Sequence, residues 1–198
     1  AAQFGTAGSG GVRWYALDNE PALWNSTHRD VHPQPLTFDE LWTRTRDVAA
    51  AIKAKDPAAV VFGPVSWGWC EYFYSAADGC SPYGADHVAH GSGPLTQWYL
   101  RKVREHEEQH GVRLVDDLDV PYYPQASGVA LSDDESAATS ARRLRSLRSL
   151  WDPAYVDESW IPAAVRLIPR MREWIAAELP GAKLAITEYS WGGDNGLS

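Results

Sequence analysis

Basic residues, cysteines and long apolar runs are all scarce in this sequence, and each scarcity excludes a class of protein. Lys and Arg number 18 against 26 Asp and Glu, which gives a net charge of −8. Proteins that bind nucleic acid neutralise phosphates with clustered Lys and Arg, so this balance predicts no nucleic-acid partner. The densest basic stretch, residues 142–148, has leucines three residues apart, and we interpret it as the solvated face of a helix.

The sequence contains no run of about 18 apolar residues, the length that a membrane-spanning helix requires. We therefore expect no membrane-bound segment. The chain does not begin with methionine, and its first residues show no signal-peptide pattern. We interpret this either as removal of a leader or as a start within a longer protein.

The two cysteines, Cys70 and Cys80, lie close together in one segment. Two cysteines near in sequence, with no others in the chain, predict a local disulfide that holds a surface loop, as is typical of exported proteins. The alternative is a pair of free thiols in a cytosolic protein. We expect the disulfide, and with it a secreted, extracellular protein.

Aromatic residues are abundant, with ten Trp and nine Tyr in 198 residues. Some of them belong in the core, which is an ordinary place for such side chains. The apolar C–H face of a sugar ring also packs well on a flat aromatic ring, while the sugar hydroxyls stay at the rim. Aromatic residues near strand ends are therefore candidates for contact with a carbohydrate.

Strands alternate with helices along the chain, which predicts an α/β fold with a parallel sheet and right-handed crossovers. The predicted strands cover residues 12–19, 59–63, 113–120 and 183–186, and the predicted helices cover 37–55, 94–110, 139–149 and 160–178. Four such units are half of a (β/α)8 barrel, which takes about 250 residues. We therefore interpret residues 1–198 as a fragment of a single TIM-type (β/α)8 barrel domain, with both edges of its sheet unpaired.

Both long helices have clear end signals in the sequence. Thr37 and Glu40 match the S/T-x-x-E capping box, which predicts that the first long helix starts at residue 37. Apolar positions such as Leu41 and Val48 then recur with helical period. Gly111 is placed to end the second long helix.

Two glutamates follow predicted strands directly. Glu20 comes after the first strand, in Asn19-Glu20-Pro21, and Glu188 comes after the last. The carboxyl ends of barrel strands are where such barrels hold their catalytic groups. Two carboxylates are the minimal set for cleaving a glycosidic bond, with Glu20 as general acid and Glu188 as nucleophile. A retaining enzyme needs about 5–5.5 Å between the carboxyl groups, and an inverting enzyme about 6.5–9.5 Å.

Polar and aromatic residues near strand ends are candidates for substrate binding. Asn19 precedes Glu20 and is placed to hydrogen-bond a sugar 2-hydroxyl. Tyr123 has the strand parity to lie beside Glu188, and Tyr122 is expected to point the opposite way. The full set of candidate substrate-binding residues is Asn19, Trp24, Trp67, Trp69, Tyr72, Tyr123, Tyr189 and Trp191.

His106 and His110 match the zinc-protease motif H-E-x-x-H. The surrounding helix is heavily charged and Gly111 ends it at once, so we interpret the match as a coincidence on a surface helix. Elsewhere, no third ligand for a metal can be chosen from the spacing of residues. We expect no metal and no cofactor, and a metalloprotease is the least favoured alternative.

Five stretches of the sequence resemble glycoside hydrolase family 44. They are YALDNEPALWNSTHRDVHP at 15–33, VVFGPVSWGWCEYFYSAADGC at 60–80, DVPYYPQASG at 119–128, LWDPAYVDESWI at 150–161 and ITEYSWGGDNG at 186–196. The resemblance covers essentially the whole chain, and its first and last stretches are specific enough to make coincidence improbable.

This resemblance implies a fold and a function. Members of the family are retaining endo-β-1,4-glucanases with a TIM-like barrel, often accompanied by a β-sandwich domain, and several also accept xyloglucan. The resemblance implies that Glu20 is the acid/base on strand 4 and Glu188 the nucleophile on strand 7, so that the four strands are strands 4 to 7. The expected partner is a β-glucan polysaccharide, and the intact enzyme is expected to be a monomer.

The sequence departs from the family at one position. Relatives usually carry a histidine at the end of the third strand, where this chain has Pro121. The alternative to an active enzyme is therefore a non-catalytic or impaired relative that binds β-glucan. The presence of both Glu20 and Glu188 favours the enzyme.

Overall fold

A computed structural model describes residues 3–192 of the chain, which divides into two compact units. The first unit comprises Ala1–Pro121 and Trp174–Thr187, and the second comprises Tyr122–Glu173 and Glu188–Ser198. The last stretch that resembles family 44, residues 186–196, extends outside the described residues. Within residues 3–192, no helix combines the length and the apolar character that crossing a membrane requires.

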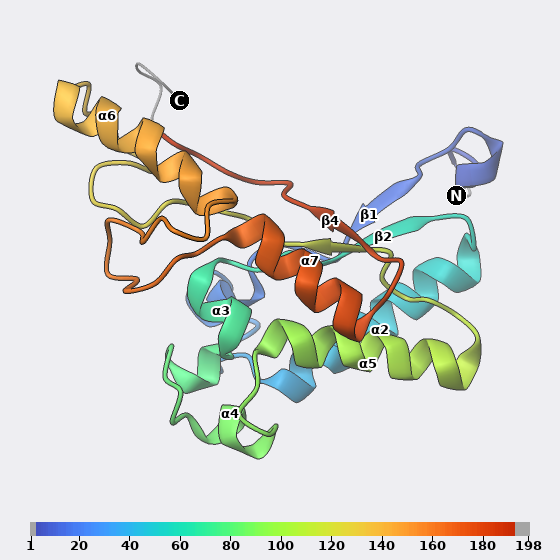
Figure 1. Ribbon diagram of the computed structural model, residues 1–198. Coiled ribbons are helices and arrows are strands. Elements are labelled where there is room, and N and C mark those ends of the chain that lie inside the picture. The colour runs from blue at the N-terminus through green and yellow to red at the C-terminus, as the bar shows by residue number, and fades with distance from the viewer. Residues whose placement is uncertain (1–2, 193–198) are drawn as a thin grey trace. The chain divides into compact units, whose positions relative to one another are not determined.

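The first unit is built on a parallel sheet of four strands (Figure 1). The strands are β1 (Trp14–Ala16), β2 (Val60–Pro64), β3 (Asp117–Asp119) and β4 (Lys183–Ala185), and they lie in the order β1-β2-β3-β4. The predicted parallel α/β arrangement is therefore confirmed. Because all four strands run in one direction, their carboxyl ends lie along one edge of the sheet.

Two of the strands are shorter in the structure than predicted. The strand predicted at 12–19 is limited to β1, because Asp18 turns the chain away with a φ of 85°. The strand predicted at 113–120 is limited to β3. Leu114 and Val115 precede β3 and are buried in the core, so their apolar character reflects packing rather than strand pairing.

The helices α2 (Phe38–Lys55) and α5 (Leu95–His110) pack against each other, and α2 also packs on β2. Oγ1 of Thr37 accepts a hydrogen bond from the N–H of Glu40 at 3.2 Å, which confirms the predicted start of α2. Gly111 ends α5 in the left-handed conformation, also as predicted. Val48 is 52% exposed and lines a cavity together with Leu41.

Short helices connect the strands to the long helices in the first unit. After β1 come η2 (Pro21–Leu23) and α1 (Trp24–Thr27), and after β2 come α3 (Trp69–Phe73), η3 (Ala76–Asp78) and α4 (Ala85–Ala89). A further short helix, η1 (Ala7–Ser9), precedes the sheet. These segments place side chains beyond the carboxyl ends of β1 and β2.

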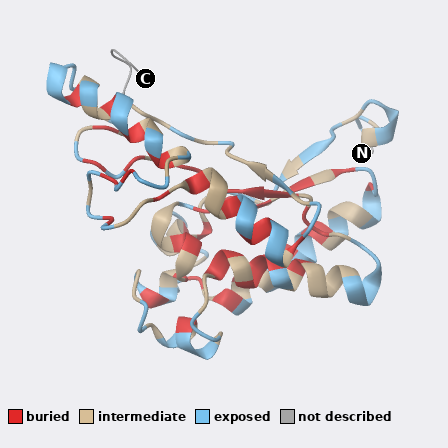
Figure 2. Ribbon diagram, viewed as in Figure 1, coloured by how far each residue is buried: buried red, intermediate tan, exposed pale blue. Residues whose placement is uncertain are grey.

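The core of the first unit lies between the sheet and α5. Val61 and Leu118 of the central strands are fully buried, as are Tyr99, Leu100 and Val103 of α5. In Figure 2 the buried colour runs along α5 and the middle of the sheet. The central strands are therefore covered by apolar side chains, as parallel strands require.

The second unit contains α6 (Ala137–Ser146), η4 (Leu147–Leu150) and the start of α7 (Leu167–Glu178). The prediction of a helix near 139–149 is confirmed, but the helix predicted at 160–178 begins only at Leu167. Arg166 adopts a φ of 37°, which is outside the helical region. The guanidinium of Arg170 instead binds the carbonyls of Ala164 and Val165.

A buried arginine organises the loop before α6. Arg143 is 2% exposed, and its guanidinium donates hydrogen bonds to backbone carbonyls of the loop at 2.7–3.4 Å. The four acceptors are Gly128, Val129, Ser132 and Asp134. The loop has no regular structure, so Arg143 satisfies backbone carbonyls that a helix or sheet would pair with N–H groups.

Candidate active site

Glu20 lies on a strained turn after β1. Its backbone adopts the left-handed conformation, with φ 44° and ψ 61°, and Asp18 and Val65 also have positive φ. Each such residue costs roughly 1–3 kcal/mol, so the surrounding structure must hold the turn in place. The N–H of Glu20 donates to the carbonyl of Val65 at 2.9 Å, and the carbonyl of Glu20 accepts from the N–H of Leu23 at 2.9 Å.

A second glutamate, Glu71 of α3, is buried in the same part of the first unit. Only 2% of it is exposed, and its Oε2 accepts a hydrogen bond from the N–H of Trp67 at 2.5 Å. Burial raises the pKa of the Glu71 carboxyl to about 8; the N–H groups of Trp67 and Ala22 oppose this rise, and the charge of Glu20 adds to it. Glu71 is not among the predicted site residues, although a charged residue inside the aromatic stretch WCEYF is a usable signal.

The aromatic residues after β2 differ in their access to solvent. Trp67 is 43% exposed, and its ring is available to a ligand. Trp69 is half-buried and packs edge-on against Tyr72. Tyr72 is fully buried, and its hydroxyl donates to the carbonyl of Pro121 at 2.6 Å. The prediction that Tyr72 stacks on substrate is therefore wrong, because its ring belongs to the core.

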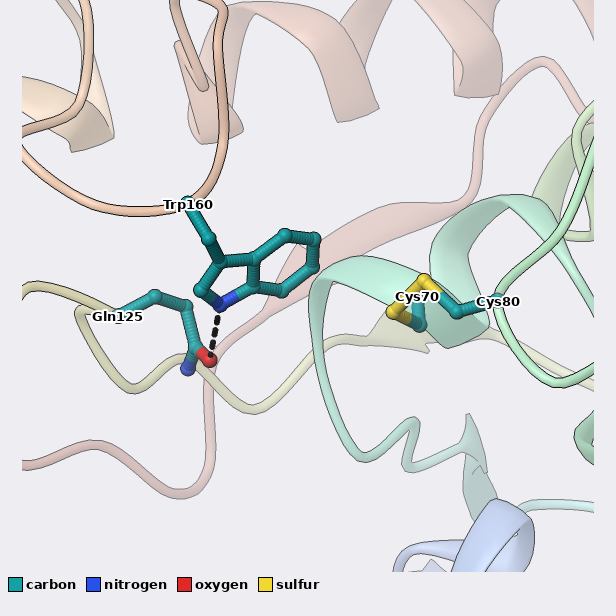
Figure 3. The surroundings of a disulfide bond; sticks show 4 residues. All are labelled: Cys70, Cys80, Gln125 and Trp160. Atoms are coloured by element: carbon teal, nitrogen blue, oxygen red, sulfur yellow. Dashed lines mark hydrogen bonds between the residues drawn. A yellow bond between two sulfur atoms is a disulfide. The ribbon is translucent and has the colours of Figure 1, made fainter.

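Cys70 and Cys80 form a disulfide that closes a loop between α3 and the turn after η3 (Figure 3). Their Cα atoms lie 5.1 Å apart, and ten positions separate them in the sequence. The structure thus contains the pairing that the cysteine spacing predicts. The bond ties the helix that carries Glu71 to the segment that follows it.

Trp24 and Asn19 lie in the segment after β1. Trp24 is mostly buried, and its Nε1 donates to the carbonyl of Asn19 at 3.2 Å, while the side chain of Asn19 is exposed. The guanidinium of Arg44 lies 5.4 Å from the centre of the Trp24 ring. Trp24 also lines a cavity of about 310 Å³ together with Asp18, Leu41 and Val48. Its ring therefore offers little free surface for stacking on a sugar.

Asp119 supports the chain just before Glu188. This residue of β3 is fully buried, and its carboxylate accepts hydrogen bonds from Oγ1 of Thr187 at 2.6 Å and from the N–H of Thr187 at 3.1 Å. The contact fixes the exit of the chain from β4 one residue ahead of Glu188. This role of Asp119 was not predicted, and the signal for it is an acidic residue with an apolar residue on either side in the sequence.

Glu188 lies in the second unit, where Tyr123 contacts it. The hydroxyl of Tyr123 donates a hydrogen bond to Oε1 of Glu188, as the strand parity of Tyr123 predicts. Tyr122 is buried, and its backbone N–H donates to the carbonyl of Glu188 at 2.9 Å. The tyrosine pair therefore holds both the backbone and the side chain of Glu188.

Aromatic residues surround Glu188 in sequence and remain partly accessible. Tyr189 is exposed, and its ring lies 6.0 Å from that of Trp191. Trp191 also contacts the ring of Tyr122, and its Nε1 donates to Oγ of Ser146 at 3.1 Å. Both residues keep surface that a ligand can reach, which is compatible with their predicted role.

Two exposed tryptophans of the second unit were not among the predicted binding residues. Trp151 and Trp160 each expose more than half of their surface. Nε1 of Trp160 donates to Oε1 of Gln125 at 3.2 Å, which fixes the edge of the ring (Figure 3). The stretch 150–161 that contains both residues was recognised only as part of the family resemblance.

His106 and His110 lie on α5 with ring centres 4.3 Å apart. Glu107, the glutamate of the H-E-x-x-H match, pairs with Arg113 at 2.8 Å. Among residues 3–192, no group of three or more His, Cys, Asp or Glu side chains is arranged to hold a metal ion. The motif therefore lies on a charged helix surface with its glutamate engaged in an ion pair.

Comparison with known proteins identifies the family. The model of glycoside hydrolase family 44 matches residues 1–126, which is more than half of the chain. The chain belongs to glycoside hydrolase family 44. This result confirms the resemblance that the five sequence stretches indicate.

Curated relatives of this family 44 chain match almost all of it. Endoglucanase A of Paenibacillus lautus is 39% identical and aligns with 96% of this chain and 28% of its own length. Beta-mannanase/endoglucanase A of Caldicellulosiruptor saccharolyticus is 35% identical and aligns with 95% of this chain and 15% of its own length. The chain therefore spans less than a third of either relative.

Solved structures of similar proteins share the fold of this family 44 chain. The bifunctional glucanase-xylanase CelM2 from a metagenome library is 45% identical, with a TM-score of 0.91 over 96% of this chain and 38% of that one. The endoglucanase Cel44A of Clostridium thermocellum is 34% identical, with a TM-score of 0.86 over 97% and 39% of the two chains. A Paenibacillus polymyxa xyloglucanase, solved with xyloglucan, is 36% identical, with a TM-score of 0.80 over 97% and 38%.

Proposed function

We propose that this chain carries both catalytic glutamates of a retaining endo-β-1,4-glucanase. The observation that carries the proposal is the hydrogen bond from Tyr123 to Glu188, because a nucleophilic carboxylate must be held in one orientation. Membership of family 44 and the position of Glu20 in the turn after the parallel strand β1 support it. The relatives named an endoglucanase, a glucanase-xylanase and a xyloglucanase make glucans, xylan and xyloglucan the candidate substrates.

In the proposed mechanism, Glu188 attacks the anomeric carbon while the glycosidic C–O bond breaks. Glu20 gives its proton to the departing sugar oxygen, and a covalent glycosyl–enzyme ester forms on Glu188. Glu20, now a carboxylate, then takes a proton from a water molecule that attacks the same carbon. This second displacement releases Glu188 and restores the proton on Glu20.

The proposal extends to the whole protein. In it, β1 to β4 are strands 4 to 7 of a (β/α)8 barrel, and residues 1–198 form part of that single domain. Asn19, Trp67, Trp69, Tyr189 and Trp191 are the proposed substrate contacts, and the complete protein acts as a secreted monomer. The disulfide between Cys70 and Cys80 supports export, because such bonds persist in oxidising compartments.

Glutamine substitutions test the catalytic roles in the complete natural protein that contains this sequence. We expect Glu188→Gln to lower kcat on a soluble β-1,4-glucan on the order of 10³-fold or more. Glu20→Gln should lower it by roughly 10²–10⁴-fold, the usual contribution of a general acid. Glu108→Gln, which changes an exposed glutamate of α5, is the matched control and should retain activity.

The stereochemistry of the first product tests the retaining mechanism separately. Proton NMR of a fresh digest should show the β anomer before mutarotation, whereas an α anomer would contradict a double displacement. The rival function is β-glucan binding without hydrolysis, which Pro121 at the family's histidine position favours. Binding of the glucan by the wild-type protein with no release of reducing ends would establish that rival.

A further inference from the structure

The carboxyl group of Glu71 lies where two loops of the first unit meet. One loop follows β2 and contains Trp67, whose N–H donates to Oε2 of Glu71. The other follows β1 and contains Glu20 and Ala22, and the N–H of Ala22 also stabilises the Glu71 carboxyl. Oε1 of Glu71 is buried and has no direct hydrogen-bond partner among residues 3–192. Glu71 is therefore shared between the segment that holds Glu20 and the neighbouring loop.

We propose that Glu71 is a positioning residue for Glu20, because its carboxyl group joins the loop after β2 to the turn on which Glu20 lies. The inference rests on the proposed role of Glu20 as general acid. Glu71 is buried away from solvent and acts on Glu20 through the backbone. Its own carboxyl does not contact the substrate.

Backbone strain makes such a support necessary. Glu20 and Val65 both have positive φ, and the N–H of the first donates to the carbonyl of the second. Non-glycine residues keep such a conformation only when their surroundings fix it. Glu71 fixes the loop that contains Val65, because its carboxyl accepts the hydrogen bond from Trp67 two residues further along the chain. Loss of this hydrogen bond releases the turn and displaces the Glu20 carboxyl.

The state of the Glu71 carboxyl fits this role. Its raised pKa keeps it protonated at neutral pH, so the group supports the turn without placing a fixed negative charge beside Glu20. A second carboxylate charge there would interact with Glu20 in every step of the proposed cycle, because the two groups are electrostatically coupled. A neutral group that still accepts hydrogen bonds avoids this. A glutamine side chain is also neutral and also accepts hydrogen bonds, so Glu71→Gln is the conservative substitution.

Two substrates separate positioning of the acid from a general loss of structure. The leaving sugar of an unmodified cello-oligosaccharide needs a proton, whereas the phenolate of 2,4-dinitrophenyl β-cellobioside departs without one. In the complete natural protein, Glu71→Leu should lower kcat/KM on the oligosaccharide by roughly 10–100-fold, because a misplaced acid loses most of its effect. On the dinitrophenyl substrate the same variant should lose less than about threefold, since that step makes no use of the acid.

Conservative variants complete the test. Glu71→Gln should retain the oligosaccharide kcat/KM to within about threefold, because its amide oxygen accepts the same N–H groups. Glu71→Asp keeps the carboxyl on a shorter stem and should reproduce the substrate dependence of Glu71→Leu in a milder form. If Glu71→Leu does not fold, the Glu71→Asp variant tests the positioning role in its place.

Asp56→Leu is the matched structural control. Asp56 is also buried, and its carboxylate accepts from the N–H groups of Ala7 at 2.6 Å and Ala58 at 3.2 Å, but it precedes β2 instead of following it. Any loss caused by Asp56→Leu should therefore be equal for both substrates. Equal losses in Glu71→Leu, or no loss in either Glu71→Leu or Glu71→Asp, would overturn the positioning role.

Glu20→Gln distinguishes failure of this inference from failure of the proposed function. It should show the same strong dependence on the leaving group as Glu71→Leu. If Glu20→Gln lost activity equally on both substrates, the acid role of Glu20 would be wrong, and the inference with it. If only the Glu71 variants lacked the dependence, the acid role would stand and the positioning role would fall.

Discussion

At the scale of single residues, buried carboxyl groups accept hydrogen bonds that fix neighbouring segments of the backbone. Asp119 accepts two hydrogen bonds from Thr187, and Glu71 accepts from Trp67. Burying a carboxyl group is costly unless its oxygens find donors, so these residues are informative where an apolar side chain is expected. Asp119 binds Thr187, the residue before Glu188, and Glu71 binds the loop that contains Val65, whose carbonyl accepts from the N–H of Glu20.

The raised pKa of Glu71 predicts how stability depends on pH. An unfolded glutamate titrates near 4.5, whereas the folded carboxyl titrates near 8. Between these values the unfolded chain loses the proton and the folded protein keeps it, so stability falls as pH rises. Below about pH 4.5 the protonated Glu71 contributes its full stabilisation to the fold, and above about pH 8 this stabilisation is lost. The difference of these two pKa values corresponds to roughly 5 kcal/mol.

Urea unfolding of wild type and Glu71→Gln at about pH 5 and about pH 8.5 measures this effect. We expect the variant to lose less stability over this interval, because it has no proton to release. Other buried acids, Asp117 and Asp157, also have a raised pKa and act in the same direction. The comparison with Glu71→Gln removes their contribution. Parallel pH profiles of the two proteins would show that Glu71 is ionised in the fold.

At the scale of helices and strands, local signals in the sequence were reliable. The start of α2 and the end of α5 were predicted from Thr37 and Gly111, because capping depends on a few neighbouring residues. The parallel order of the strands followed from their alternation with helices. The alternation of side chains along the third strand also predicted that Tyr123 lies beside Glu188.

Features that depend on tertiary packing were predicted less well. Leu114 and Val115 resemble strand residues but pack in the core outside β3, and Tyr72 resembles a binding residue but is buried. An aromatic side chain near a strand end can face solvent or core, and only its neighbours decide between the two. Glu71 was missed for the same reason, since its burial and its contact with Trp67 are not visible in sequence spacing.

The disulfide beside α3 supports a prediction at this scale. Replacing both cysteines, in Cys70→Ser/Cys80→Ser, should lower the free energy of unfolding by about 2–3 kcal/mol, because the unfolded chain regains the entropy of the loop. Chemical denaturation of wild type and variant under oxidising conditions measures the difference. A reducing agent should destabilise the wild type and leave the variant unchanged. Equal stability of the two proteins without reductant would contradict the prediction.

At the scale of the whole molecule, apolar surface of the first unit points to a covering segment. β1 is an outer strand of the described sheet, and its Trp14 is 67% exposed. Val48 on α2 is also exposed. Large apolar side chains at a sheet edge are an aggregation hazard, which proteins remove by covering or pairing the edge. In the proposed barrel, a preceding strand and its helix lie at this edge.

This arrangement predicts that Trp14 is protected in the complete protein and reactive in the 198-residue chain by itself. Hydroxyl-radical footprinting read by mass spectrometry compares the two, and we expect Trp14 oxidation to fall at least about fivefold in the complete protein, because pairing and covering would bury the ring. Tyr83, three residues after Cys80, is exposed and does not belong to the sheet, so its oxidation should be similar in both. Equal reactivity of Trp14 in the two proteins would mean that no strand pairs with β1. The identification of β1 to β4 as strands 4 to 7 of a closed barrel would then fail, even if Glu20 and Glu188 kept their proposed roles.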